Sequence, residues 1–191
     1  RFDPKKGLML SGTYEYASEM LGGDKNFWRA FGEMNYLHQV YKDKSDRPWV
    51  LALRADISAA EAFDDDEQVP IYEKMYAGGI GSIRGFSYRG ISPRDSEGDE
   101  IGGELANTYS AEFFVPVYQN LIRASAFYDI GAVWADIDDM DGDPWRSSVG
   151  GGLHVQTPLS PMPIRLYYAK ELDANGDDDT ESFQFTFGAF F

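Results

Sequence analysis

The segment that decides the fold runs from residue 76 to residue 94 and reads Tyr76-Ala-Gly-Gly-Ile-Gly-Ser-Ile-Arg-Gly-Phe-Ser-Tyr-Arg-Gly-Ile-Ser-Pro-Arg94. Its glycines and its proline disfavour a regular strand or helix. Large apolar side chains lie between the glycines, which is not typical of a solvated linker. Glycine lets a backbone approach another surface closely, and an arginine held on such a backbone can bind a carboxylate in a defined geometry. The segment therefore predicts a loop that folds inward and docks Arg84 on buried carboxylates.

A phosphate-binding loop is a competing interpretation of the glycines. Gly79, Gly81 and Gly85 are spaced G-x-G-x-x-x-G, which is one residue longer than the dinucleotide-binding fingerprint. No Gly-Lys-Ser/Thr follows, and no predicted strand leads into a predicted helix at this point. Nucleotide binding is therefore not expected.

The composition bounds the class of protein. The chain has 191 residues, a formal net charge of −15 and a sequence pI of about 4.4, which argues against a nucleic-acid partner. It has no cysteine, so a disulfide framework and a thiolate metal site are both excluded. No apolar run reaches the roughly 18 residues of a membrane helix. The mean hydropathy of −0.42 fits a soluble protein, but it also fits a membrane β-barrel with a polar interior. The first residues read as internal to a longer protein, so the lack of a signal peptide says little about location.

Alternating polarity organises most of the chain. Apolar or aromatic residues recur at every second position over eight stretches, which predicts strands with one face in each of two media. These stretches cover residues 8–16, 27–41, 49–60, 106–117, 121–134, 147–157, 164–170 and 181–191. Short connections alternate with long ones, so we predict an all-β fold: a transmembrane, antiparallel, up-and-down β-barrel with a long inward-folded loop at 61–105. A secreted β-sandwich is the alternative, and it would pack its aromatic side chains in a central core.

Two carboxylates are the predicted docking partners of the loop. If the apolar faces meet lipid, Glu112 and Asp129 both point into the lumen from adjacent antiparallel strands. Two buried carboxylates repel each other unless a cation lies between them. Arg84 can supply that cation through a bidentate guanidinium, and Arg123, on the same face as Asp129, is an alternative. Solvated lumen charges are the simpler interpretation, and the alternation alone does not choose between these readings.

Four motifs, in order, carry a resemblance to a known family. Gly78-Gly79-x-x-Ser82-Ile83-Arg84-Gly85-Phe86 resembles the Val/Ile-Arg-Gly-Phe/Tyr loop motif of the BamA-type outer-membrane protein assembly superfamily, the bacterial surface antigen barrel. Two segments resemble the two strands that follow this loop in the family: Tyr109-Ser-Ala-Glu112-Phe-Phe-Val-Pro116 and Phe127-Tyr-Asp129-Ile-Gly131-Ala-Val-Trp134. A third segment resembles the family's terminal strand with its aromatic end signal: Phe183-Gln-Phe-Thr-Phe187-Gly188-Ala-Phe-Phe191. The match spans nearly the whole chain, and the ordered combination is highly specific.

The resemblance implies a location, a site and a function. Residues 1–191 would form the C-terminal half of a 16-stranded barrel in the outer membrane of a Gram-negative bacterium. The family's loop arginine pairs with carboxylates at the positions of Glu112 and Asp129, which selects Arg84 over Arg123. The implied activity is folding and insertion of outer-membrane proteins, or polypeptide translocation, with no enzymatic step and no cofactor. The implied partners are the lipid bilayer, client outer-membrane proteins, periplasmic POTRA domains and accessory lipoproteins.

Two further functional interpretations stay open at this point. The chain could be the barrel half of a fused patatin-like phospholipase, whose catalytic residues would lie upstream, or a passive small barrel of eight strands.

The acidic stretches Asp136–Asp143 and Asp173–Asp179 suggest calcium, but neither has EF-hand spacing. We predict that both are solvated outer loops and that no metal is bound. His38 and His154 are isolated in the sequence and are predicted to be structural.

Overall fold

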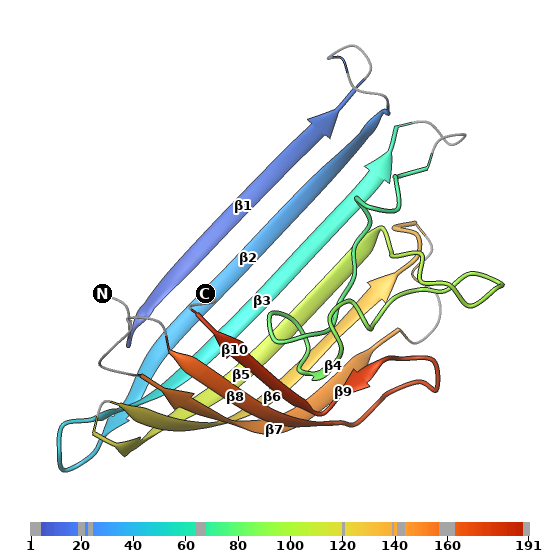
Figure 1. Cartoon of the computed structure of the whole chain (residues 1–191). Helices are drawn as coiled ribbons and strands as arrows, with labels where there is room; N and C mark the ends of the chain where they lie inside the picture. Colours follow the sequence, from blue (N-terminus) through green and yellow to red (C-terminus); the bar gives the residue numbers. More distant parts are fainter. Residues whose placement is uncertain are drawn as a thin grey trace.

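The computed structural model describes residues 5–18, 22, 25–63, 68–119, 121–138, 140, 144–156 and 163–188. Eight strands form one antiparallel sheet in the order β1-β2-β3-β5-β6-β7-β8-β10 (Figure 1). Their bounds are Gly7–Ala17 (β1), Phe27–Lys42 (β2), Pro48–Ala62 (β3), Leu105–Tyr118 (β5), Ile122–Trp134 (β6), Arg146–Val155 (β7), Ile164–Glu171 (β8) and Phe183–Phe187 (β10). Two short strands, β4 (Gly85–Phe86) and β9 (Thr180–Glu181), pair with each other separately. Each strand of the large sheet pairs with its neighbour in sequence, which confirms the predicted up-and-down fold.

The end of the chain differs from the prediction. A single last strand was expected over residues 181–191, but the structure divides this stretch. Thr180–Glu181 pairs with β4 in the loop, and only Phe183–Phe187 joins β8. The break falls at Ser182, whose carbonyl still accepts the N–H of Ala169 on β8 at 2.8 Å, while the two residues before it pair with the loop. Residues 189–191 lie outside the described part of the chain.

Side chains sort between the two faces of the sheet as the alternation predicts. Tyr109, Tyr128 and Tyr168 are exposed on the outer face. The phenylalanines Phe183, Phe185 and Phe187 of β10 are 57%, 69% and 60% exposed, which excludes the closed aromatic core of a soluble sandwich at this strand. Small and polar residues occupy the inner face of the same strands, and several of them are buried: Ser125, Asp129, Ser148, His154 and Gln184. An apolar outer face with a polar inner face is the pattern of a membrane β-barrel.

The sheet is curled but open. Figure 1 shows strands β7, β8 and β10 curving away from the longer strands β1, β2 and β3, with the loop between β3 and β5 in the curve. Within the described residues β1 and β10 each have one strand neighbour in the large sheet, and they do not pair with each other. A closed barrel of these eight strands is therefore not what the chain forms. No helix in the described part of the chain is long and apolar enough to cross a membrane.

The core of the molecule lies between the loop and the inner face of the sheet. Ile83 and Phe86 of the loop are fully buried, and they belong to an apolar cluster with Ala60 of β3, Ala106 of β5 and Val133 of β6. A second, smaller cluster contains Phe127, Tyr167 and Ala169, with Ile80 of the loop packed against it. The loop thus supplies apolar side chains that cover the inner face of the open sheet. The burial of Ile83 fixes the loop backbone directly before Arg84.

Candidate functional site

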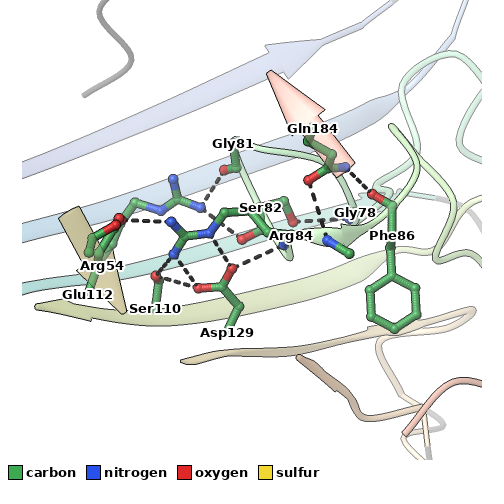
Figure 2. A network of polar contacts seen from close by, with 12 residues as sticks. Arg54, Gly78, Gly81, Ser82, Arg84, Phe86, Ser110, Glu112, Asp129 and Gln184 are labelled. Atoms are coloured by element: carbon green, nitrogen blue, oxygen red, sulfur yellow. Dashed lines mark hydrogen bonds and ion pairs between the residues drawn. The ribbon is translucent and has the colours of Figure 1, made fainter. Parts of the chain in front are cut away.

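The loop reaches the sheet through a tight turn held by its own backbone. Gly79 donates its N–H to the carbonyls of Ile83 and Phe86, at 3.1 and 3.0 Å. Ser82 closes the turn from inside, since its hydroxyl accepts the N–H of Gly78 at 3.2 Å. Arg54 of β3 donates to the carbonyls of Gly81 and Ser82 and so holds the tip of the turn on the sheet (Figure 2). These contacts fix the direction in which the next residue, Arg84, leaves the loop.

Arg84 lies between two carboxylates, as Figure 2 shows. Its Nε and Nη2 donate to the two oxygens of Asp129 at 2.7 and 2.8 Å, and its backbone N–H donates to the same carboxylate at 3.1 Å. Its Nη1 donates to Glu112 at 2.7 Å, and its Nη2 donates to the hydroxyl of Ser110 at 3.1 Å. Arg84 is 4% exposed and Asp129 is 0% exposed. A bidentate, buried arginine–carboxylate pair of this kind is among the strongest polar contacts in proteins, and it is costly to break from one side.

Aromatic rings enclose the guanidinium from the other side. Its Cζ lies 3.5 Å from the ring centre of Phe127 and 4.8 Å from that of Tyr167. The two rings meet edge to face, with 5.8 Å between their centres. A cation over an aromatic face is stabilised most where water is excluded, as it is here. The alternation places Tyr167 inward, but neither ring could be assigned to Arg84 from sequence, because the contact depends on the curl of the sheet.

The electrostatic balance of the site favours a charged Arg84. Burial alone would lower the pKa of the Arg84 guanidinium, but the hydrogen bonds to Asp129 and the charges of Glu112 and Asp129 raise that pKa above its ordinary value. The guanidinium therefore stays protonated at any physiological pH, so a change of pH does not break the ion pair by deprotonating Arg84.

His154, which is isolated in the sequence, is part of the site. The Nε2 of His154, on β7, lies 3.3 Å from Glu112 and 3.3 Å from the hydroxyl of Ser125. Its ring also packs edge-on against Phe114, with 4.9 Å between ring centres. Glu112 thus lies between Arg84 and His154, so three strands and the loop meet at one carboxylate. The sequence offered no signal for this contact beyond the inward parity of His154.

The structure also separates the two candidate arginines. Arg84 forms the bidentate pair with Asp129, whereas the guanidinium of Arg123 lies 5.3 Å from the ring of Phe114. All three glycines of the motif have left-handed backbones, with φ of +103° at Gly78 and +93° at both Gly79 and Gly85. A Cβ on Gly85 would approach the Cβ of Ala169 to 3.1 Å, so the glycine permits the close contact with β8.

The remaining predicted sites are placed as follows. Phe187 ends β10, and the N–H of Gly188 donates to the carbonyl of Pro163 at 3.1 Å; Phe191 lies outside the described residues. Residues 173–177 and 179 of the second acidic stretch are exposed, as predicted, but the side chain of Asp178 turns inward to an ion pair with Arg146, and Ser147 donates to Asp173. Part of the first acidic stretch lies outside the described residues. Among the residues that are described, no group of three or more acidic or histidine side chains is arranged to hold a metal ion.

Comparison with known proteins identifies the family. The Omp85 superfamily domain matches residues 1–191, the whole of the chain. The chain belongs to the Omp85 superfamily. Members of this family are β-barrels of the bacterial outer membrane, and that is the location of this chain.

Individual Omp85 relatives agree with this assignment. The outer membrane protein assembly factor BamA of Nitratidesulfovibrio vulgaris is 29% identical over 194 residues, which cover 98% of this chain and 23% of that protein. The BamA of Neisseria meningitidis serogroup B is 27% identical over 177 residues, covering 76% of this chain and 22% of that protein. The crystal structure of Haemophilus ducreyi BamA lacking POTRA domains 1–3 matches with a TM-score of 0.80 and 26% identity, over 95% of this chain and 38% of that one. The chain thus spans about a quarter of the length of the curated relatives.

Proposed function

We propose that the protein to which this Omp85 chain belongs folds and inserts other β-barrel proteins into the outer membrane. Both curated relatives described above are named as assembly factors, which favours this function over that of a fused phospholipase. The observation within the chain that supports it best is the buried contact of Arg84 with Glu112 and Asp129. We assign to this contact the task of keeping the loop docked in the lumen while the edge of the sheet works on a client. The activity needs no catalytic residue and no cofactor from this chain.

We also propose that residues 1–191 are the C-terminal half of a 16-stranded barrel, with loop 61–105 inside its lumen. The open sheet supports this arrangement, because the outer edges of β1 and β10 carry backbone groups that must be paired within a bilayer. An upstream half with eight strands would pair with both edges. Periplasmic POTRA domains and accessory lipoproteins would then deliver clients from the N-terminal side. A structure of the full-length protein in which β1 pairs with β10 directly would contradict the half-barrel arrangement.

Arg84→Ala in the full-length protein tests the proposed function. The assay reconstitutes the protein in lipid vesicles and follows the folding of a heat-modifiable β-barrel client by its gel shift. Since removal of one partner from a buried ion pair costs about 3–5 kcal/mol, we expect the loop to undock and the initial rate of client folding to fall at least about tenfold. Arg47→Ala is the matched control, because Arg47 pairs with Asp43 in the β2–β3 turn. It should change the rate less than about twofold.

The possible outcomes separate the two parts of the proposal. A loss of client folding in Arg84→Ala but not in Arg47→Ala supports the role of the docked loop. Undocking of the loop without any loss of client folding would refute that role and leave the contact as a stability element. Wild-type protein that does not accelerate client folding in the presence of its full accessory complex would refute the assembly function itself.

A further inference from the structure

The terminal strand β10 is held weakly by the sheet. Five residues of β10 pair with β8, from Phe183 opposite Tyr168 to Phe187 opposite Ile164. By comparison, β1 pairs with β2 over eleven residues. A short edge strand with a ladder on one side is the part of a sheet that opens at the lowest free energy. Beyond this ladder, the carbonyl of Ser182 accepts the N–H of Ala169 at 2.8 Å, and further contacts hold β10 from its inward face.

One side chain of β10 binds the loop backbone next to Arg84. Gln184 is 4% exposed and points toward the loop, as Figure 2 shows. Its Nε2 donates to the carbonyl of Phe86 at 2.7 Å, and its Oε1 accepts the N–H of Gly85 at 3.4 Å. Its Nε2 also lies 3.5 Å from a carboxylate oxygen of Glu181. A carboxamide is suited to this place, because one group supplies both the acceptor for the Gly85 N–H and the donor for the Phe86 carbonyl.

The segment that leads into β10 is fastened to the same stretch of loop. Glu181 pairs with Gly85 and Thr180 with Phe86 in the β4–β9 ladder. The N–H of Ser87 then donates to the carbonyl of Asp179 at 2.9 Å. Gly90 lets the two segments approach each other, since a Cβ at this position would lie 2.6 Å from the Asp179 carbonyl oxygen. Residues 85–90 and 179–184 thus form one continuous contact, which we call the loop–strand clamp.

The clamp and the arginine pair lie on opposite sides of one short piece of backbone. Arg84 is bound to β5 and β6 through Glu112 and Asp129, and the next residue, Gly85, is bound to β9 and Gln184. The loop therefore forms a brace across the inner face of the sheet, from β6 to β10, past β7 and β8. Neither end of the brace can move far without disturbing the other, because only one peptide bond separates them.

We infer that Gln184 is a positioning residue that couples the terminal strand to the docked loop, so that β10 and residues 83–90 are released together. Release of the loop then lowers the free energy needed to open the edge at β10, and opening of β10 loosens Arg84 from Asp129 to the same extent. This reciprocity is required for any two coupled equilibria. The coupling is a property of the fold, and it does not depend on which client is handled or on whether clients are handled at all.

Hydrogen exchange on the full-length protein in lipid vesicles tests the coupling in both directions. Gln184→Met keeps the length of the side chain and removes its hydrogen bonds, so exchange in residues 83–90 should rise about three- to tenfold, as expected for one or two lost neutral hydrogen bonds. Arg84→Ala should raise exchange in residues 83–90 by at least about a hundredfold. It should also raise exchange clearly in residues 179–187, although the side chain of Arg84 binds Asp129, Glu112 and Ser110 and stacks on Phe127 and Tyr167, none of which belongs to β10.

Controls separate coupling from a general loss of structure. Thr186→Val changes the next inward residue of β10, which lies opposite Arg165, and should alter exchange in residues 83–90 less than about twofold. Exchange in the β1–β2 ladder, which contains none of the partners of Arg84 or Gln184, should stay unchanged in every variant and so report that the sheet is folded. The proposal is overturned if Arg84→Ala accelerates exchange in the loop and leaves residues 179–187 at the wild-type rate. It is equally overturned if Gln184→Met affects β10 and not the loop. Both readouts are independent of client folding, so failure of the proposed function would leave this result intact.

Discussion

The first strand of the sheet and the strands β6, β7 and β8 obey the same alternation and differ sharply in burial. β1 is exposed along almost its whole length, whereas the inward residues of β6, β7 and β8 are buried. The difference comes from the loop, whose residues Ile80, Ile83 and Phe86 pack on the inner face of the covered strands. Alternation therefore decides which way a side chain points, and the loop decides which inward side chains lose contact with water.

Polar contacts on the inner face show the same contrast. In the uncovered part, Ser11 donates to Glu33 at 3.4 Å on an exposed surface, and Asn35 donates to the same carboxylate. In the covered part, Ser110, which is half-buried, donates at 2.6 Å to Asp129, which has no exposed surface. A hydrogen bond or ion pair contributes little on an exposed surface, and breaking one partner is costly where the other stays buried. Matched substitutions in the two parts should therefore differ in cost.

The largest difference is expected for a carboxylate changed to its amide. Asp129→Asn turns one acceptor of the bidentate pair into a donor that faces the Arg84 guanidinium, and should lower the free energy of unfolding in lipid by about 3–5 kcal/mol. Glu33→Gln makes the same chemical change on the uncovered part and should cost less than about 1 kcal/mol. Urea titration of vesicle-embedded protein, read by heat-modifiability, measures both values. Equal costs for the two variants would mean that the loop does not shield Asp129 from water.

A glycine pair gives the next largest difference. Gly85→Ala forces a side chain onto a backbone with φ of +93° and toward the Cβ of Ala169, and should destabilise the protein by about 1–3 kcal/mol. Gly12→Ala lies in the middle of β1, where the nearest atom to an added Cβ is the Phe31 carbonyl oxygen at 3.9 Å. That substitution should be neutral or slightly stabilising, because alanine loses less backbone entropy on folding. The same titration checks both, and a destabilising Gly12→Ala would show that β1 is packed more tightly than its exposure indicates.

The contrast also shows how far sequence alone could go. Strand positions and faces follow from a local period of two, so the fold class and the inward direction of Glu112 and Asp129 could be predicted. The contacts of Phe127, His154 and Gln184 could not, because they depend on how far the sheet curls and on where the loop comes to rest. No local pattern encodes those long-range distances. The predicted last strand, residues 181–191, was wrong at Glu181 for the same reason, since Glu181 pairs with the loop and not with β8.

The aromatic rings that contact Arg84 and Arg29 provide a third comparison. Phe127→Leu removes the ring 3.5 Å from the Arg84 guanidinium and should cost about 1–3 kcal/mol, from the lost cation–π contact and the space left behind. Phe31→Leu removes an exposed ring 5.4 Å from Arg29, whose guanidinium keeps its ion pairs with Glu15 and with Glu73 of the loop, and should cost about 0.5 kcal/mol. Unfolding titrations again give the values. If Phe127→Leu cost no more than Phe31→Leu, the stacking would be incidental to how tightly Arg84 is held.

The smallest difference is expected between two serines. Ser110→Ala leaves Asp129 without one donor and Arg84 without one acceptor, but both keep charged partners, so the cost should be about 1 kcal/mol. Ser11→Ala removes a long, exposed contact with Glu33, which water replaces, and the free energy of unfolding should change by less than about 0.3 kcal/mol. A double substitution of Ser110→Ala with Asp129→Asn sharpens the result. Its cost should be smaller than the sum of the two single costs, because the serine loses its role once the carboxylate is gone. Additive costs would mean that Ser110 acts on Arg84 independently of Asp129, and the site would then be two separate contacts rather than one network.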